Sequence, residues 1–221
     1  MRPAILTAAV VFAVAQSAWA SAPKDAWKVT RVKDPITGAS SCVVTAADQV
    51  SSFAFTRSGY LYPIAENNSQ FGLLVGVSTG GQIRLPSGDI LWKVDDKPFR
   101  ELKAADNPVG NSTAATFPLP AGATPELKSA METSARAIAG LTATSTVASG
   151  DKAREILAEM YAGKSLLFRA ANAAPAYGLP SSATNRVGQI TSDGQRPISI
   201  DQSFRSGLSQ CGIAPDGTLS K

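Results

Sequence analysis

Two serines lie in short patterns known from enzymes with a serine nucleophile. Gly76, Ser78 and Gly80 match G-x-S-x-G, in which the serine sits on a sharp strand-to-helix turn near a histidine base. Ser149 and Lys152 match S-x-x-K, in which the lysine can deprotonate the serine. The chain has no histidine, no helical period follows Gly80, and the companion motifs S-D-N and K-T-G are missing. We therefore interpret both serines as structural residues and predict no catalytic residue.

The acidic residues do not form an evident acid/base pair. Asp95 and Asp96 are adjacent, so in a strand their side chains would point to opposite faces. We interpret them as a strand end or turn before Lys97-Pro98. Asp89 could meet Asp95 only through tertiary folding, and a calcium site there lacks EF-hand-like spacing. Without histidine and with two cysteines, histidine-based and Cys₄ zinc sites are excluded. We predict no metal and no cofactor.

Cys42 and Cys211 are the two cysteines of the chain. In an oxidising compartment an even count predicts a disulfide, and two cysteines allow one connectivity. Closing so long a loop would stabilise the fold by up to about 5 kcal/mol in the chain-entropy model. The alternative is a pair of buried thiols that behave as small apolar groups.

Three further patterns could carry a modification or a ligand. Asn67 and Asn111 each begin a glycosylation sequon, which matters only in a host that glycosylates secreted proteins. Tyr60, Tyr62 and Pro63 form a small aromatic cluster. Core packing is the default for such a cluster, and an exposed binding patch is the alternative.

The first twenty residues read as a cleavable secretory signal peptide. Arg2 supplies the positive region, residues 4–15 are uncharged and mostly apolar, and Ala18-Trp19-Ala20 is a small-x-small cleavage site. We expect cleavage after Ala20, which leaves residues 21–221 as one β-rich domain. No later stretch is long and apolar enough for a transmembrane helix. The expected location is the periplasm or the extracellular medium.

Alternating apolar residues predict a mainly β fold with a few helices, built as an antiparallel sandwich or meander. The predicted strands lie near 27–30, 41–45, 53–55, 71–77, 90–94 and 165–170, and one face of the fourth carries Phe71, Leu73, Val75 and Val77. The breaks fall at Asp34-Pro35, Ser58-Gly59, Gly80-Gly81 and Pro86-Ser87-Gly88.

Two or three helices are predicted in the C-terminal half. Thr124 and Pro125 are suited to begin the first, whose apolar residues include Leu127, Met131, Ile138 and Leu141. The second has an apolar stripe of Ala153, Ile156, Leu157, Met160 and Tyr161, with Asp151 near its start, and Gly163 suits its C′ position. The last starts near Asp201, places Phe204, Leu208 and Cys211 on one face, and stops at Gly212. Residues 105–125, 142–150 and 171–198 read as polar breaks or loops.

The charge of the chain limits its partners. The formal net charge is +4, and removal of Arg2 with the signal peptide lowers it to +3. The basic residues are scattered without a cluster of five or more, so we expect no nucleic-acid partner.

The order of features resembles the invasion-associated locus B family of exported bacterial proteins and related periplasmic domains. The likeness is carried by Trp27, Cys42, the segment 94–96 (VDD), the segment 162–169 (AGKSLLFR) and the closing segment 198–212 (ISIDQSFRSGLSQCG). The chain departs from that pattern in its longer, alanine-rich 105–150 segment and at Gln202. The resemblance implies a β-rich envelope protein without known catalytic residues.

Together these patterns predict an exported, non-catalytic protein that acts by binding or in a structural or accessory role. The expected partner is an envelope or host protein. One alternative is a periplasmic hydrolase that uses Ser/Lys or carboxylate residues. Another is a subunit of a surface or secretion assembly, which predicts an exposed apolar patch of several hundred Å².

Overall fold

The computed structural model describes residues 25–47, 61–80, 84–108, 122, 124–171, 190–191, 194–195 and 197–220. Within this part, two antiparallel sheets and three α-helices confirm the prediction of a mainly β fold with a few helices. The predicted signal peptide, the strand at 53–55, the Ser58-Gly59 turn and most of two predicted loops, 105–125 and 171–198, lie outside the described residues.

The first sheet is a four-strand meander with a fifth strand added later in the chain. Its order is β1 (Trp27–Lys33), β2 (Ser40–Ala46), β3 (Leu61–Asn68), β4 (Gly72–Thr79) and β7 (Ser145–Ser149). The β1–β2 turn forms because the Asp34 carboxylate accepts hydrogen bonds from the Ile36 and Thr37 N–H groups. The Asn68 side chain does the same for Gln70 and Phe71 in the β3–β4 turn.

The second sheet has the order β11 (Ile198–Ser199), β8 (Ser165–Ala170), β5 (Ile90–Val94) and β6 (Arg100–Leu102). Its strands are antiparallel, and Trp92 at its centre pairs with both Arg100 and Phe168. A separate short ladder joins β9 (Ile190–Thr191) and β10 (Gly194–Gln195). The alternation of Ile90, Trp92 and Val94 is confirmed, since all three side chains are buried.

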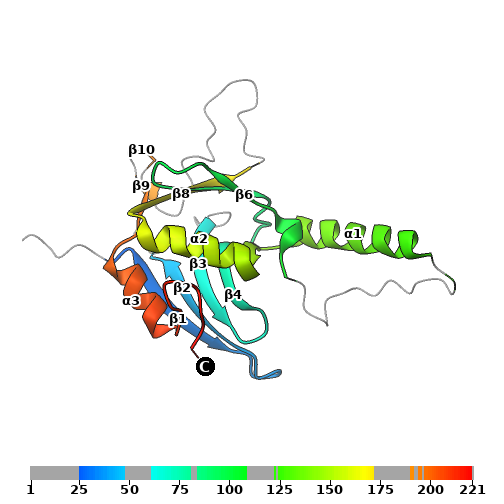
Figure 1. Cartoon of the computed structure of the whole chain (residues 1–221), viewed down its shortest axis with the longest axis horizontal. Coiled ribbons are helices and arrows are strands. Elements are labelled where there is room, and N and C mark those ends of the chain that lie inside the picture. The colour runs from blue at the N-terminus through cyan, green and yellow to red at the C-terminus, as the bar shows by residue number, and fades with distance from the viewer. Residues whose placement is uncertain are drawn as a thin grey trace, which may run out of the picture.

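The helices are α1 (Pro125–Thr142), α2 (Gly150–Ala162) and α3 (Gln202–Gln210), with a short 3₁₀ turn, η2 (Ala104–Asp106), before α1. In Figure 1, α2 lies between the strands of the second sheet and those of the first, and α1 points away from the rest of the protein. One core cluster draws side chains from both sheets, α2 and α3, including Val75, Trp92, Ile156 and Phe204. None of the described helices is both long and apolar enough to cross a membrane.

Residues 142–150 were expected to be a polar break, and this expectation is wrong. Residues 145–149 instead form the edge strand β7, which pairs with β4. Val147 and Ala148 are buried, and the Thr146 hydroxyl lies 2.8 Å from that of Ser87. Asn107 completes the strand, because its side-chain amide donates to Ser145 O and accepts from Val147 N. The polar groups of this segment thus find hydrogen-bond partners that are distant in sequence, although its composition is typical of a loop.

Two finer expectations also need correction. Phe71 does not share a face with Leu73, Val75 and Val77, because it lies before Gly72, whose φ of +73° turns the chain, and it packs with the small second cluster around Leu74. Gly163 follows α2 with a φ of −85° and is no left-handed C′ residue. It is needed for space, since a Cβ there would lie 2.4 Å from Val94 Cγ1.

Candidate functional site

Ser78 lies within β4 and not on a strand-to-helix turn. It pairs with Tyr62 of β3 on one side and with Ser145 of β7 on the other, so the backbone around it is extended. The glycines of the motif serve packing. A Cβ at Gly76 would lie 2.1 Å from Thr146 O, and one at Gly80 would lie 2.2 Å from Cε2 of the Tyr62 ring. The G-x-S-x-G pattern therefore marks close approach of strands and has no nucleophile-elbow geometry.

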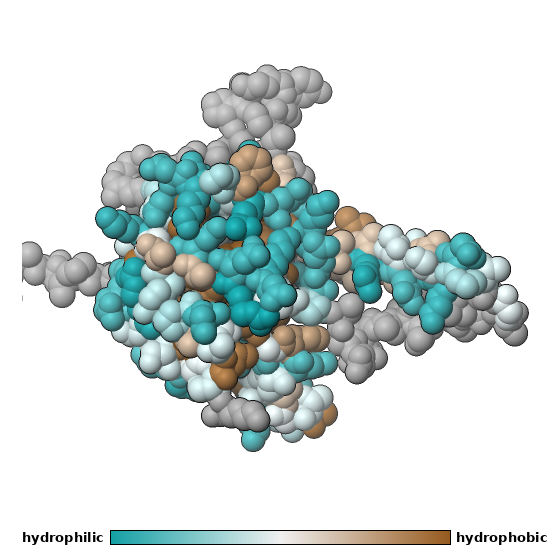
Figure 2. Space-filling view, in the orientation of Figure 1, coloured by the Kyte–Doolittle hydropathy of each residue, from teal (hydrophilic) through white to brown (hydrophobic). Residues whose placement is uncertain are grey.

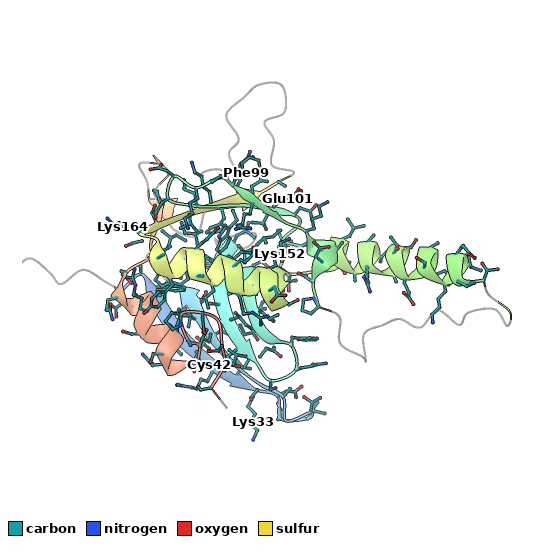
Figure 3. All side chains as sticks on the ribbon, in the orientation of Figure 1. Lys33, Cys42, Phe99, Glu101, Lys152 and Lys164 are labelled. Carbon is teal, nitrogen blue, oxygen red and sulfur yellow. A yellow bond between two sulfur atoms is a disulfide. The ribbon has the colours of Figure 1, made fainter. Side chains whose placement is uncertain are left out.

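Ser149 and Lys152 do not form a catalytic pair. Ser149 ends β7 and is the N-cap of α2, although its side chain makes no capping hydrogen bond. Lys152 Nζ lies 3.8 Å from Asp106 Oδ2 in η2. The lysine is thus engaged by a carboxylate and has no contact with the serine hydroxyl. In Figure 3, Lys33, Lys152 and Lys164 lie at three separate places on the protein.

Asp95 holds the start of β8 in place. It directly follows β5 with a φ of +48°, and its carboxylate accepts hydrogen bonds from the Ser165 hydroxyl and from the N–H groups of Lys164 and Ser165. The Ser165 hydroxyl hydrogen bond holds the pKa of Asp95 below its usual value. The expected turn role of Asp95 is therefore confirmed.

The other two aspartates of this region do not share the hydrogen-bond partners of Asp95. Asp89 has a different partner, the N–H of Ala104, at 2.8 Å, and Asp96 is exposed in the turn. Among the residues that the structure describes, no three metal-binding side chains come together.

The remaining candidates are the aromatic cluster and the two sequon asparagines. Those that the structure describes serve in packing. Tyr62 is half-buried in β3 with its ring against Gly80, and Pro63 is buried. Asn67 donates from Nδ2 to Cys211 O at 2.8 Å, so this sequon asparagine is held against the end of α3. Tyr60 and Asn111 lie outside the described residues.

The predicted pairing of Cys42 with Cys211 is confirmed. The two sulfurs are bonded at 2.01 Å, with Cα atoms 5.3 Å apart and a sequence separation of 169. Cys42 lies in β2, and Cys211 caps the C-terminus of α3. Both cysteines of the chain are used, so no free thiol remains. The bond ties the last helix to the first sheet.

Hydrogen bonds accepted by Asp201 and Ser203 reinforce the same junction at the other end of α3. Asp201 caps the helix by accepting from the N–H groups of Ser203 and Phe204, and it also accepts from Ala26 N at 3.1 Å. The Ser203 hydroxyl accepts from Trp27 N at 3.0 Å. The Trp27 ring lies against Phe204, with centroids 4.6 Å apart. Sequence reasoning placed the start of the helix at Asp201 but did not find that this cap also binds β1.

This arrangement favours the ionised form of the Asp201 carboxyl group. Burial by itself would raise the pKa of Asp201, but the hydrogen bonds from the Ser203 hydroxyl and from the Ala26, Ser203 and Phe204 N–H groups outweigh burial and lower it. A lowered pKa means that the ionised carboxylate stabilises the fold above the usual pKa of about 4. This contribution is lost as the pH falls through the lowered pKa.

We therefore expect Asp201→Asn to lower the free energy of unfolding by about 1 kcal/mol at neutral pH, because the amide keeps an acceptor oxygen but lacks the charge that strengthens these hydrogen bonds. The difference from the wild type should be constant above about pH 4 and shrink below it. Urea unfolding followed at several pH values measures this difference. Asp25→Asn is the control, since Asp25 has no hydrogen bond to the described part of the chain. A difference that stays constant down to pH 2 would contradict the role of the charge.

A shallow surface hollow lies beside the disulfide. Its lining includes Arg31, Lys33, Ser41, Cys42 and Asn67. Arg31 is held by Gln210 O, to which its Nη2 donates at 2.7 Å. The hollow brings together no acid/base pair and no metal-binding set among the described residues.

Three of the exposed large hydrophobic residues lie on α1. Thr124 caps it as predicted, its Oγ1 accepting from Leu127 N, and Pro125 is its first residue. Leu127, Ile138 and Leu141 are exposed, with 43%, 56% and 73% of their surface accessible. Figure 2 shows hydrophobic residues on the surface of α1 near its junction with the body. Exposed apolar residues on a projecting helix are typical of a contact with another molecule.

Comparisons with protein-family models, with curated proteins and with solved structures found no match to this chain.

Proposed function

We propose that this is an exported protein of the bacterial envelope or the extracellular medium, which acts by binding or in a structural role and does not catalyse a reaction. The observation that carries the proposal is the Cys42–Cys211 disulfide. Such bonds persist in oxidising compartments and are rare in the cytosol. The signal-peptide pattern of residues 1–20 supports the same location.

The positions of the candidate catalytic residues support a non-catalytic role. Ser78 is paired with β3 and β7 near the end of β4, Lys152 is paired with Asp106, and Asp95 is engaged with Ser165. A serine nucleophile needs a base within hydrogen-bonding reach. The described part of the chain provides neither serine with such a base.

The resemblance to the invasion-associated locus B family also supports the proposal. Residues that carry it lie together in space, although they are far apart in sequence. Trp27 packs on Phe204 and donates from Nε1 to Ser199 O, and Cys42 is bonded to Cys211. The closing segment therefore serves to bind the last helix to the first sheet, a structural task.

Expression of the whole chain in a Gram-negative host tests the proposal. We expect an oxidised protein in the periplasm or medium, and chemical cross-linking there should recover a specific envelope partner. A variant without residues 1–20 is the control and should stay in the cytoplasm with two reduced thiols. Cytoplasmic retention of the full chain would contradict export. An ester- or peptide-hydrolysing activity lost in Ser78→Ala or Ser149→Ala would contradict the non-catalytic role.

The exposed apolar residues of α1 favour a second candidate function, that of a subunit in a surface or secretion assembly. An assembly subunit needs an apolar contact surface outside its own core. Leu127, Ile138 and Leu141 provide one on an element that projects from the body.

A further inference from the structure

The Cys42–Cys211 bond is more accessible to solvent from one cysteine than from the other. Cys211 is 5% exposed, whereas Cys42 is half-buried and lines the surface hollow described above. Lys33, which Figure 3 labels together with Cys42, lines the same hollow. A disulfide exchanges when a thiolate reaches one of its sulfurs, so access helps to decide which sulfur reacts. Access therefore favours reaction at Cys42.

Two cations share the face of the sheet on which Cys42 lies. Arg31 is the direct cross-strand partner of Cys42, and Lys33 lies two residues farther along β1. Both also line the hollow, and none of the described residues that line it is acidic. On β3, Glu66 pairs with Val43 and so belongs to the opposite face. A negatively charged molecule that enters the hollow is therefore attracted by its lining.

Arg31 is held between the elements that carry the two cysteines. Its Nη2 donates to Gln210 O at 2.7 Å, and Gln210 directly precedes Cys211. The guanidinium is thus tied to both sides of the bond, as a cross-strand neighbour of Cys42 and as a donor to α3. The C-terminal end of a helix disfavours a negative charge. A thiolate released at Cys211 therefore needs a cation nearby, and Arg31 provides it.

We propose that this disulfide is an exchange site for small anionic thiols, with Cys42 as the attacked residue. The incoming thiol gives its proton to water, and its thiolate forms a new S–S bond with Cys42 Sγ. The Cys42–Cys211 bond breaks, and its electron pair leaves on Cys211 Sγ, which takes a proton from water. The incoming thiol is oxidised to a mixed disulfide and Cys211 is reduced to a thiol, so the reaction needs no other oxidant or reductant.

Hydrogen bonds keep the site together after the disulfide opens. Asn67 donates from Nδ2 to Cys211 O at 2.8 Å, and Arg31 donates to Gln210 O. Asp201 caps the other end of α3. The Cys211 thiol therefore stays beside the mixed disulfide and re-forms the native bond when it displaces the anionic thiol. The exchange is a reversible modification, and it goes beyond the proposed binding or structural role.

Three thiols that share a two-carbon chain test the charge preference on the oxidised wild type. 2-Mercaptoethanesulfonate is anionic, 2-mercaptoethanol is neutral and cysteamine is cationic. Each rate of disulfide opening is divided by the rate of the same thiol with hydroxyethyl disulfide, a small neutral disulfide. We expect this ratio to be about tenfold higher for the anionic thiol than for the cationic one at low salt. Added salt should reduce the difference. Equal ratios, or a higher ratio for cysteamine, would overturn the proposal.

Variants that remove one charge test whether the hollow causes this preference. Arg31→Gln and Lys33→Gln should each lower the preference for the anionic thiol by about threefold, because each removes a cation from the hollow. Lys28→Gln is the matched control, since Lys28 is exposed on the same strand but alternates onto the opposite face. It removes the same charge and should keep the wild-type preference. An equal effect of all three substitutions would contradict the role of the hollow.

The position of the adduct tests which sulfur is attacked. After a brief reaction with 2-mercaptoethanesulfonate and an acid quench, peptide mass analysis should find the mixed disulfide on Cys42 and the free thiol on Cys211. Tryptophan fluorescence should keep its native value meanwhile, since Trp27 stays packed on Phe204. An adduct mainly on Cys211 would overturn the proposal. So would a bond that none of the three thiols opens in the folded protein.

Discussion

Replacement of both Cys42 and Cys211 by serine should lower the free energy of unfolding by about 3–5 kcal/mol. The bond closes a loop of 169 residues, and the chain-entropy model gives about 5 kcal/mol for a loop of this length. The double variant should keep its core, since Phe204 and Leu208 still bury the apolar face of α3. Urea unfolding followed by tryptophan fluorescence measures the loss, because Trp27 lies against α3.

Reduction of the wild type provides the matched control for this experiment. Reduced wild type and the double-serine variant should unfold at the same urea concentration, since both lack the bond and otherwise keep the same contacts. The oxidised wild type should unfold at a clearly higher concentration. Coincidence of all three transitions would show that the bond does not stabilise the fold.

Gly76→Ala should destabilise the protein by about 3 kcal/mol, at the upper end of the overpacking range. The added methyl group would lie 2.1 Å from Thr146 O and 2.7 Å from Val147 Cα. Both are backbone atoms of β7, so relief requires that the whole strand move away from β4. Such movement would also separate Thr146 from its hydroxyl partner Ser87. Thermal and urea unfolding measure the effect.

Ser78→Ala is the matched control on the same strand and should change the free energy of unfolding by less than about 0.5 kcal/mol. If Ser78 were instead the nucleophile of a hydrolase, Ser78→Ala would abolish the activity although it barely changes the stability. Native stability in Gly76→Ala would contradict the close approach of β4 and β7.

Local patterns in the sequence were enough to predict several elements. Ile90, Trp92 and Val94 alternate with polar or half-buried neighbours, and period two is a property of a single strand. Thr124-Pro125 and Asp201 predicted helix starts because capping depends on neighbouring residues. Cys42 and Cys211 were paired on count and compartment, with no knowledge of their distance.

Other features depended on partners far away in the chain. The strand β7 was missed because its polar side chains are satisfied by Ser87 and Asn107, which come from other segments. The same holds for Asp95, whose partner Ser165 follows 70 residues later. The apolar residues of α1 were visible in the sequence, but their exposure depends on what packs against them. Local patterns therefore found elements and missed the contacts that join them.

The intact mass of the unreduced protein, recovered from the periplasm or medium of expressing cells, tests the central claim most directly. Export and oxidation predict the mass of residues 21–221, less two hydrogens for the Cys42–Cys211 bond. A mass that still includes residues 1–20 would contradict the account. So would a mass that rises by two alkyl groups when the unreduced protein is treated with a thiol-alkylating reagent.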